Sequence, residues 1–166
     1  LLQSSAASDV YKRQMKELTV GDTAYLSTDV GPVIDSRALA SLNEHVSYME
    51  DKGVLHYVCD LPDVGNKGNS FFAPRLYEID DISLLKEEVF GPCVHVIRFK
   101  SGPEALDYVM KQIEGTGFGL TFGIHSRIED KCSYLAARSP AGNVYINRNM
   151  IGAVVGVQPF GGRGLS

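Results

Sequence analysis

The sequence lacks the features that would direct it to a membrane or to a nucleic acid. No apolar run approaches the roughly 18 residues that a membrane span needs, and the first residues contain no basic segment followed by an apolar one. Lys and Arg are scattered and the net charge is -4, so no basic patch is predicted. We therefore expect a soluble, cytoplasmic protein that binds a small molecule, with no nucleic-acid partner and no membrane span.

Cysteine is also scarce. Cys59, Cys93 and Cys132 are widely spaced, with no Cys-x-x-Cys pair and no histidine at ligand spacing, which argues against disulfides and structural zinc. Each cysteine falls on an expected strand or on an apolar helix stripe, so we expect all three to pack in the core. The four histidines also fall on expected strands and helices, and the sequence assigns them no catalytic role.

Residues 1–14 are small and polar and show no sustained periodicity of either 2 or 3.6 residues. We expect this segment to be unpacked. It also resembles the adaptor-like tails of assembled sequence reads, so a non-native origin is one alternative. The remaining residues, 15–166, have the composition of a soluble globular protein with one modest core.

The first half of the chain predicts one helix and two strands. Asp35 or Ser36 can cap a helix that runs to about Lys52. Its apolar stripe consists of Leu39, Leu42, Val46 and Met49. A strand is predicted over residues 54–61, and a second over 71–79, where Pro74 favours an edge or irregular strand.

The second half alternates strand, helix, strand, helix, strand. The strands are expected at residues 93–99, 120–125 and 143–147. A helix capped by Ser101 and a helix over 128–138 connect them. This order predicts an α/β fold with an open, mostly parallel sheet and flanking helices, whose ligand site lies outside the carboxyl ends of the strands.

The stretch Glu87 to Pro92 carries the first chemical signal. It places an acid pair, one aromatic residue and a Gly-Pro turn directly before an apolar strand. A carboxylate held there can accept two hydrogen bonds from a diol such as a ribose, and the ring of Phe90 can pack on a flat heterocycle. A plain helix-to-strand connection is the alternative.

The glycine-rich segment from Ile151 to Gly164 carries the second signal. Glycine allows backbone N–H groups to approach an anion without an obstructing side chain, so the segment suits a ligand loop. A flexible linker is the alternative, although Val154, Val155 and Phe160 are more apolar than most linkers.

Three motifs together resemble the aldehyde dehydrogenase superfamily. They are Glu87 to Pro92, Gly142 to Asn147 and Pro159 to Gly162, in the order and at the spacing of that family. The resemblance covers Met15 to Ser166. Longer blocks resemble more narrowly the 1-pyrroline-5-carboxylate dehydrogenase domain of bifunctional bacterial proline-utilisation proteins. These blocks are residues 18–22, 26–35 and 152–162.

The resemblance implies roles at matching positions. Glu88 corresponds to the acid that accepts from the nicotinamide-ribose hydroxyls of NAD, and Phe90 to the ring beside the nicotinamide. Gly152 and Ala153 correspond to the loop whose N–H groups hold the substrate carboxylate, and Phe160 to an aromatic wall of the aldehyde site. Paired acceptors suit a diol and convergent donors suit a carboxylate.

The implied reaction is the NAD-dependent oxidation of L-glutamate 5-semialdehyde to L-glutamate. The nucleophilic cysteine and the general-base glutamate of the family are expected upstream of this chain, which we interpret as a catalytic-domain fragment, truncated at both ends and inactive alone. The parent is expected to be a homo-oligomer, and an upstream proline dehydrogenase domain with FAD is left open. The alternatives are another semialdehyde dehydrogenase of the superfamily and a non-catalytic scaffold module.

Overall fold

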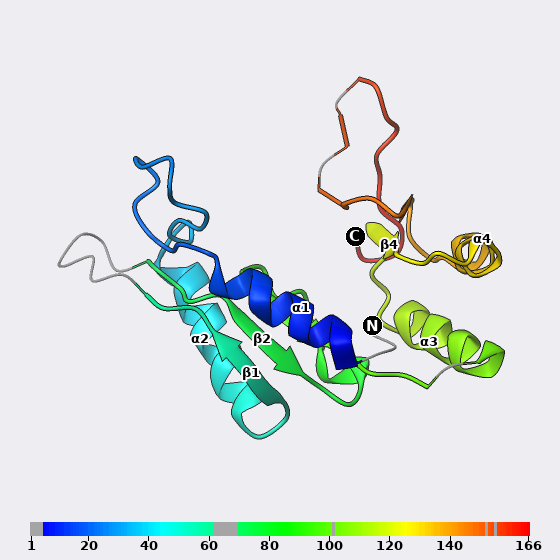
Figure 1. The fold of residues 1–166 in the computed structure, drawn as a ribbon, viewed down its shortest axis with the longest axis horizontal. Helices are drawn as coiled ribbons and strands as arrows, with labels where there is room; N and C mark the ends of the chain where they lie inside the picture. Colours follow the sequence, from blue (N-terminus) through cyan, green and yellow to red (C-terminus); the bar gives the residue numbers. More distant parts are fainter. Residues whose placement is uncertain (1–4, 62–69, 101, 152, 155) are drawn as a thin grey trace. The chain divides into compact units, whose positions relative to one another are not determined.

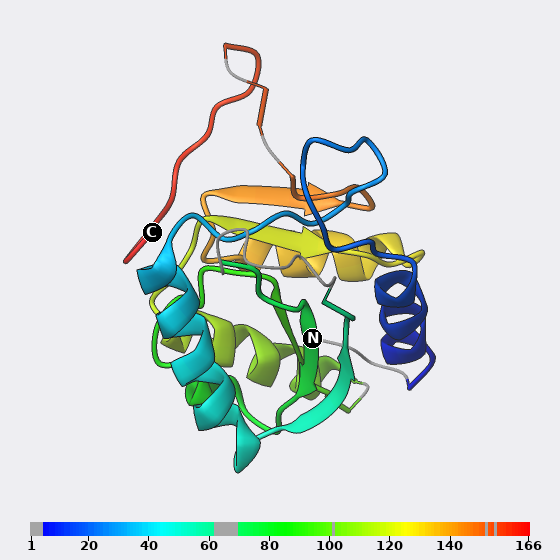
Figure 2. The same ribbon diagram turned by 90° about the vertical axis from the view of Figure 1, so that its left-hand side faces the viewer.

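The chain folds into two compact units, Leu1–Phe99 and Lys100–Ser166. The computed structural model describes residues 5–61, 70–100, 102–151, 153–154 and 156–166 (Figures 1 and 2). Within these residues, each unit contains its own sheet and its own helices. No helix in the described part of the chain combines the length and the apolar character needed to cross a membrane.

The first unit is built around a three-stranded sheet in the order β1-β2-β3. Its elements are α1 (Ser5–Lys16), α2 (Ser36–Glu50), β1 (Val54–Val58), β2 (Arg75–Glu78), the 3-10 helix η1 (Ile82–Leu84) and β3 (Cys93–Val96). β1 pairs antiparallel with β2, with a register shift between Leu55 and Tyr57. β2 pairs in parallel with β3. The central strand is therefore β2, which is paired on both sides. The prediction of an edge or irregular strand is wrong, because Pro74 comes directly before the first paired residue, Arg75.

The two helices of this unit cover opposite faces of the sheet (Figures 1 and 2). Successive residues of a strand point to opposite faces, and β2 shows this clearly. Leu76 is fully buried in a cluster with Met15 of α1, whereas Tyr77 is buried in a second cluster with Met49 of α2. Each face of β2 thus has a core of its own.

Helix α2 follows from its sequence. Asp35 is the N-cap, and its Oδ1 accepts a hydrogen bond from the Ala38 amide at 2.8 Å. Leu42 and Met49 are buried, and the other two residues of the predicted stripe are partly buried. After Glu50, the Gly53 amide donates to the Met49 carbonyl at 3.0 Å. The predicted cap and stripe are confirmed.

Helix α1 covers much of the segment that we expect to be unpacked, and its described side chains over residues 9–14 are exposed or partly buried. Residues Ser5–Lys16 are helical. Met15, near its end, is 7% exposed, and the Cys59 thiol donates to its carbonyl oxygen. Val10 and Tyr11 are exposed, so little of the described helix is buried. The structure therefore shows a helix here, while most of its described side chains remain outside the core.

The second unit is a β-α-β arrangement preceded by a helix. Its elements are α3 (Pro103–Gly115), β4 (Thr121–Ile124), α4 (Glu129–Arg138) and β5 (Asn143–Ile146). β4 and β5 are parallel, as predicted for strands joined through a helix. The predicted stripe of α3 is buried at Leu106, Val109 and Met110, whereas Ser101, the predicted cap, lies outside the described residues. Ile128, the first residue of the predicted helix over 128–138, is the N-cap of α4 and is 51% exposed.

The α/β class with mostly parallel strands and flanking helices is confirmed. The pairing of the strands is different from the predicted run of three strands joined by two helices. Among the described residues, β3 pairs with β2, whereas β4 pairs with β5. The partner of β3 is β2, which precedes it in the sequence, so a helix-connected pattern in the second half could not reveal it.

Candidate functional site

The turn Glu87 to Pro92 has a backbone shape fixed by main-chain hydrogen bonds. The Gly91 amide donates to the Val89 carbonyl at 3.0 Å, and the Cys93 amide donates to the Gly91 carbonyl at 2.8 Å. The Arg75 amide, at the start of β2, donates to the Pro92 carbonyl at 3.0 Å. The turn is thus bonded both to itself and to the central strand. The helical element that precedes the turn is η1, which ends at Leu84.

Helix α2 packs directly against this turn. Leu42 is 2% exposed, and a Cβ atom built on Gly91 would lie 2.5 Å from Leu42 Cδ2. Contacts this short do not occur between real side chains, so only glycine fits at this position without displacing Leu42. The packing of α2 and the glycine in the turn therefore depend on each other.

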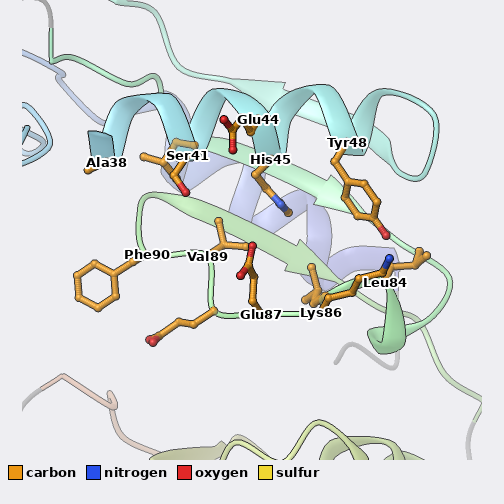
Figure 3. Close-up of a pocket in the computed structure, with 13 residues that line it drawn as sticks. Ala38, Ser41, Glu44, His45, Tyr48, Leu84, Lys86, Glu87, Val89 and Phe90 are labelled. Carbon is orange, nitrogen blue, oxygen red and sulfur yellow. The ribbon is translucent and has the colours of Figure 1, made fainter. Parts of the chain in front are cut away.

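A pocket of about 440 Å³ lies between α2 and the segment that leads into the turn (Figure 3). Its lining residues are Ala38, Ser41, Leu42, Glu44, His45, Tyr48, Leu84, Leu85, Lys86, Glu87, Glu88, Val89 and Phe90. In Figure 3, Phe90 stands at the end of the pocket near Ala38, whereas Tyr48 and Lys86 stand at the other end. The structure thus brings both predicted cofactor residues, Glu88 and Phe90, to one pocket.

The chemistry of this pocket is acidic and aromatic. Glu44, Glu87 and Glu88 supply carboxylate oxygens, which accept hydrogen bonds from hydroxyl groups. Phe90 is 86% exposed, so its ring is available to a flat partner. These residues fit the ribose and the heterocycle of a nucleotide cofactor.

Two histidines form a direct pair at the same place. His45 Nε2, on α2, lies 2.8 Å from His95 Nε2, on β3. Burial lowers the pKa of His45, and burial together with the neighbouring His45 lowers the pKa of His95 to about 4. Both imidazoles are therefore uncharged at neutral pH.

Sequence reasoning treated each histidine separately and missed this pair. Fifty residues separate them, and no local spacing connects them. One signal was present: His45 follows Leu42 by three residues, and so extends the buried stripe of α2.

The cysteines are placed as predicted, away from this chemistry. Cys59 and Cys132 are buried and Cys93 is partly buried; all three are free, and none lines the pocket. Burial raises the pKa of the Cys93 thiol to about 11, and it also raises the pKa of Cys59. In the described residues, no group of three His, Cys, Asp or Glu side chains could hold a metal ion.

The predicted substrate loop belongs to the second unit. Gly152 lies outside the described residues; Ala153 is partly buried and Phe160 is 55% exposed. The Val157 amide donates to the Val154 carbonyl at 3.0 Å, which forms a turn within the loop. The cofactor residues and the substrate residues therefore lie in different units, and their meeting in one site stays a prediction.

Backbone contacts fix both ends of this glycine-rich segment. At its start, the Asn147 amide donates to the Ile124 carbonyl at 2.8 Å, and the Asn147 side chain bonds both backbone groups of Ser126. At its end, the Gly161 carbonyl accepts from Asn143 Nδ2 at 2.9 Å. Further along, the Leu165 amide donates to the Gly117 carbonyl at 2.8 Å. These contacts anchor the two ends of the segment, and its role as a ligand loop stays a prediction.

The sequence matches the aldehyde dehydrogenase family over residues 3–166. The chain belongs to this family. Among curated relatives, it is 44% identical to the bifunctional protein PutA of Escherichia coli over 156 residues, which cover 92% of this chain and 12% of that protein. It is 32% identical to the 1-pyrroline-5-carboxylate dehydrogenase of Bacillus thuringiensis over 157 residues, 91% of this chain and 28% of that protein.

Solved structures of the family agree with this assignment. Proline utilization A from Bradyrhizobium japonicum matches 99% of this chain and 16% of that chain, with a TM-score of 0.90 and 44% identity. A 1-pyrroline-5-carboxylate dehydrogenase from Thermus with bound NAD matches 96% of this chain and 30% of that chain, with a TM-score of 0.80 and 28% identity. The chain spans less than a third of the length of these relatives. The predicted resemblance to the aldehyde dehydrogenase family is confirmed.

Proposed function

We propose that the chain is part of an NAD-dependent dehydrogenase that oxidises L-glutamate 5-semialdehyde to L-glutamate in proline catabolism. The observation that carries the proposal is that Glu88 and Phe90, from one rigid turn, both line the same pocket. The relatives support the substrate, since they are named PutA and 1-pyrroline-5-carboxylate dehydrogenase, and a Thermus relative was solved with NAD bound.

NAD supplies the hydride acceptor when it is bound. Glu88 would accept two hydrogen bonds from the ribose diol and so fix the orientation of the sugar. The exposed ring of Phe90 would pack beside the nicotinamide and shield it from water. Together these contacts would hold one face of the cofactor toward the aldehyde.

At the substrate end, we assign the loop of the second unit to the carboxylate of the semialdehyde. The backbone N–H groups of Gly152 and Ala153 would donate to the carboxylate, and Phe160 would form an apolar wall beside the carbon chain. Recognition of the carboxylate would distinguish this substrate from uncharged aldehydes, because N–H donors left unpaired in a closed site are costly.

The nucleophile of the reaction is assigned to a cysteine outside this chain. Cys59, Cys93 and Cys132 are all at least partly buried and none lines the pocket. A thiol whose pKa is near 11 is protonated at neutral pH and is a poor nucleophile. The chain by itself is therefore expected to turn over no aldehyde, and the general base is likewise assigned outside it.

The test uses the complete protein that contains this chain, with NADH formation followed by absorbance. We expect turnover of L-glutamate 5-semialdehyde with NAD. Glu88→Gln is expected to raise the KM for NAD about tenfold, because one strong charged acceptor is lost. Glu87→Gln is the matched control, since Glu87 lines the same pocket but has no assigned ribose contact.

Three outcomes separate the alternatives. Faster turnover of succinic semialdehyde than of the glutamate derivative would favour another semialdehyde dehydrogenase. Preference for uncharged aliphatic aldehydes would remove the carboxylate assignment. A complete protein that forms no NADH with any aldehyde would favour a scaffold module. An FAD-dependent proline dehydrogenase domain in the complete protein is decided by the gene sequence upstream of this chain.

A further inference from the structure

The His45–His95 pair joins α2 and β3, which both adjoin the turn from Glu87 to Pro92, here called the cofactor turn. Their Nε2 atoms are 2.8 Å apart, with ring centroids at 5.0 Å and planes at 83°. Since both rings are neutral, one nitrogen donates and the other accepts, which requires opposite tautomers. The bond is thus a directional link between α2 and β3.

Tyr77 of the central strand holds both imidazoles in place. Its ring is 3% exposed and stacks on His95, with centroids 6.0 Å apart and planes at 13°. It meets the ring of His45 edge-on, with centroids at 6.5 Å and planes at 87°. The parallel register pairs Tyr77 with His95 directly. The histidines are therefore packed in a defined geometry on the face of the sheet that α2 covers.

The pair also lies within a few residues of each contact that shapes the turn. On α2, His45 is three residues after Leu42, which fills the space beside Gly91. On β3, His95 is three residues after Pro92, whose carbonyl is bonded by β2. His45 itself lines the pocket that contains Glu88 and Phe90. A shift of α2 away from β3 would therefore break the contact between Leu42 and Gly91 and, at the same time, widen the pocket.

We propose that His45 and His95 are positioning residues for the cofactor turn, and that their hydrogen bond holds α2 against β3 so that Glu88 and Phe90 keep a fixed place. This inference rests on the proposed function, because it assigns a role at the same site. The pair acts through the turn and not on the reacting atoms. Its loss is expected to weaken NAD binding and to leave the chemical step unchanged.

The experiment compares His45→Leu, His45→Gln and the control His125→Gln in the complete protein. His45→Leu removes the hydrogen bond and keeps an apolar side chain; we expect the KM for NAD to rise about fivefold, with kcat and the aldehyde KM within twofold. His45→Gln can still bond His95 Nε2, so it is expected to restore most of the NAD affinity. His125 is exposed in the second unit, and its replacement is expected to change nothing.

A second readout does not depend on activity. Amide hydrogen exchange, measured by mass spectrometry on peptides covering residues 87–95, is expected to be faster in His45→Leu than in the wild type and near normal in His45→Gln. Should His45→Leu not fold, His95→Leu removes the same bond from the β3 side, and full NAD affinity in that variant would contradict the proposal.

The outcomes distinguish a failure of the positioning role from a failure of the proposed function. If Glu88→Gln weakens NAD binding but His45→Leu leaves both the NAD KM and the exchange of residues 87–95 unchanged, the positioning role is wrong and the proposed function stands. If the wild type binds no NAD, the proposed function fails and the cofactor role of the pair fails with it. Faster exchange in His45→Leu would then support only the mechanical link between α2 and the turn.

Discussion

Leu42 of α2 occupies the space that a side chain on Gly91 would need: a Cβ atom there would lie 2.5 Å from Leu42 Cδ2 and 2.7 Å from Leu42 Cδ1. Leu42 is 2% exposed, so it has little room to move aside. The turn with Glu88 and Phe90 and the helix that forms the other wall of the pocket are thus fitted to each other at one glycine.

The first prediction concerns this contact. Gly91→Ala is expected to lower the free energy of unfolding by about 1–3 kcal/mol, because an overpacked site forces the neighbouring side chain or backbone to shift. Chemical denaturation measures the change. Gly115→Ala is the control, since a Cβ at Gly115 meets nothing within 4 Å and alanine favours the helix that Gly115 ends. An unchanged midpoint for Gly91→Ala would show that α2 is not seated on the turn.

The second prediction concerns a carboxylate that joins all three segments of the first sheet. Glu78 of β2 accepts from His56 Nε2 of β1 at 2.7 Å and from Arg98 Nε, just beyond β3, at 2.7 Å. The hydrogen bond from Arg98, followed by that from His56, lowers the pKa of Glu78. Glu78→Gln is expected to cost about 1 kcal/mol at pH 7, a modest amount because the group is partly solvated.

The sign of the pH dependence follows from the lowered pKa. The folded state binds fewer protons on Glu78 than the unfolded state does. The stability that Glu78 contributes is therefore fully present above the ordinary carboxyl pKa of 4.5, and it is lost as the pH falls through the lower pKa of Glu78 in the folded state. Denaturation from pH 7 to pH 3 should therefore show a steeper loss in the wild type than in Glu78→Gln. Arg37→Gln is the control, because Arg37 is 93% exposed in its ion pair with Asp35. If Arg37→Gln lowered the free energy of unfolding at pH 7 as much as Glu78→Gln does, the stabilising role of Glu78 would be contradicted.

The third prediction concerns the closed loop of the second unit. A Cβ on Gly142 would lie 1.9 Å from the Gly161 carbonyl oxygen, a backbone atom that cannot rotate away. Gly142→Ala is expected to lower the free energy of unfolding by more than about 2 kcal/mol and to expose residues 161–166 to proteolysis. Gly161→Ala is the matched control on the other side of the same contact, where a Cβ meets nothing within 4 Å. Equal stability of the two variants would argue against the contact.

The fourth prediction concerns the thiols. Because burial raises the pKa of Cys93 to about 11 and also raises that of Cys59, neither is expected to react with iodoacetamide at pH 7.5 in the native chain. All three cysteines are expected to react in denaturant. Mass spectrometry counts the modified sites. Rapid labelling of native Cys93 would reopen the possibility of a nucleophile within this chain.

Local sequence information predicted the elements whose causes are local. The cap at Asp35 and the stripe through Leu42 and Met49 predicted α2, because capping and periodicity act within a few turns. The same information did not indicate α1, whose buried residue Met15 belongs to a cluster with residues as distant as Leu76 and Val96. Strand grouping failed for a similar reason, since β3 pairs with a strand that precedes it.

The site divides in the same way. Glu88 and Phe90 could be singled out because the turn that carries them is a contiguous motif, and the structure shows that both line one pocket, whereas their cofactor role stays a prediction. The opposite wall of their pocket, with Glu44, His45 and Tyr48, could not be predicted, because it lies about 40 residues earlier on a helix. Residues of one motif are visible in the sequence, whereas the surface that completes their pocket is set by tertiary packing.

The two asparagines at the ends of the glycine-rich loop have a consequence for how this loop can vary. Asn147 fixes the start and Asn143 fixes the carbonyl of Gly161, so the loop is closed by contacts that belong to the sheet and not to the loop itself. For a loop closed in this way, a doubling of length costs only about 0.6 kcal/mol of closure entropy. The segment between Asn147 and Gly161 could therefore accept insertions or substitutions, while the parallel pair β4 and β5 keeps its stability.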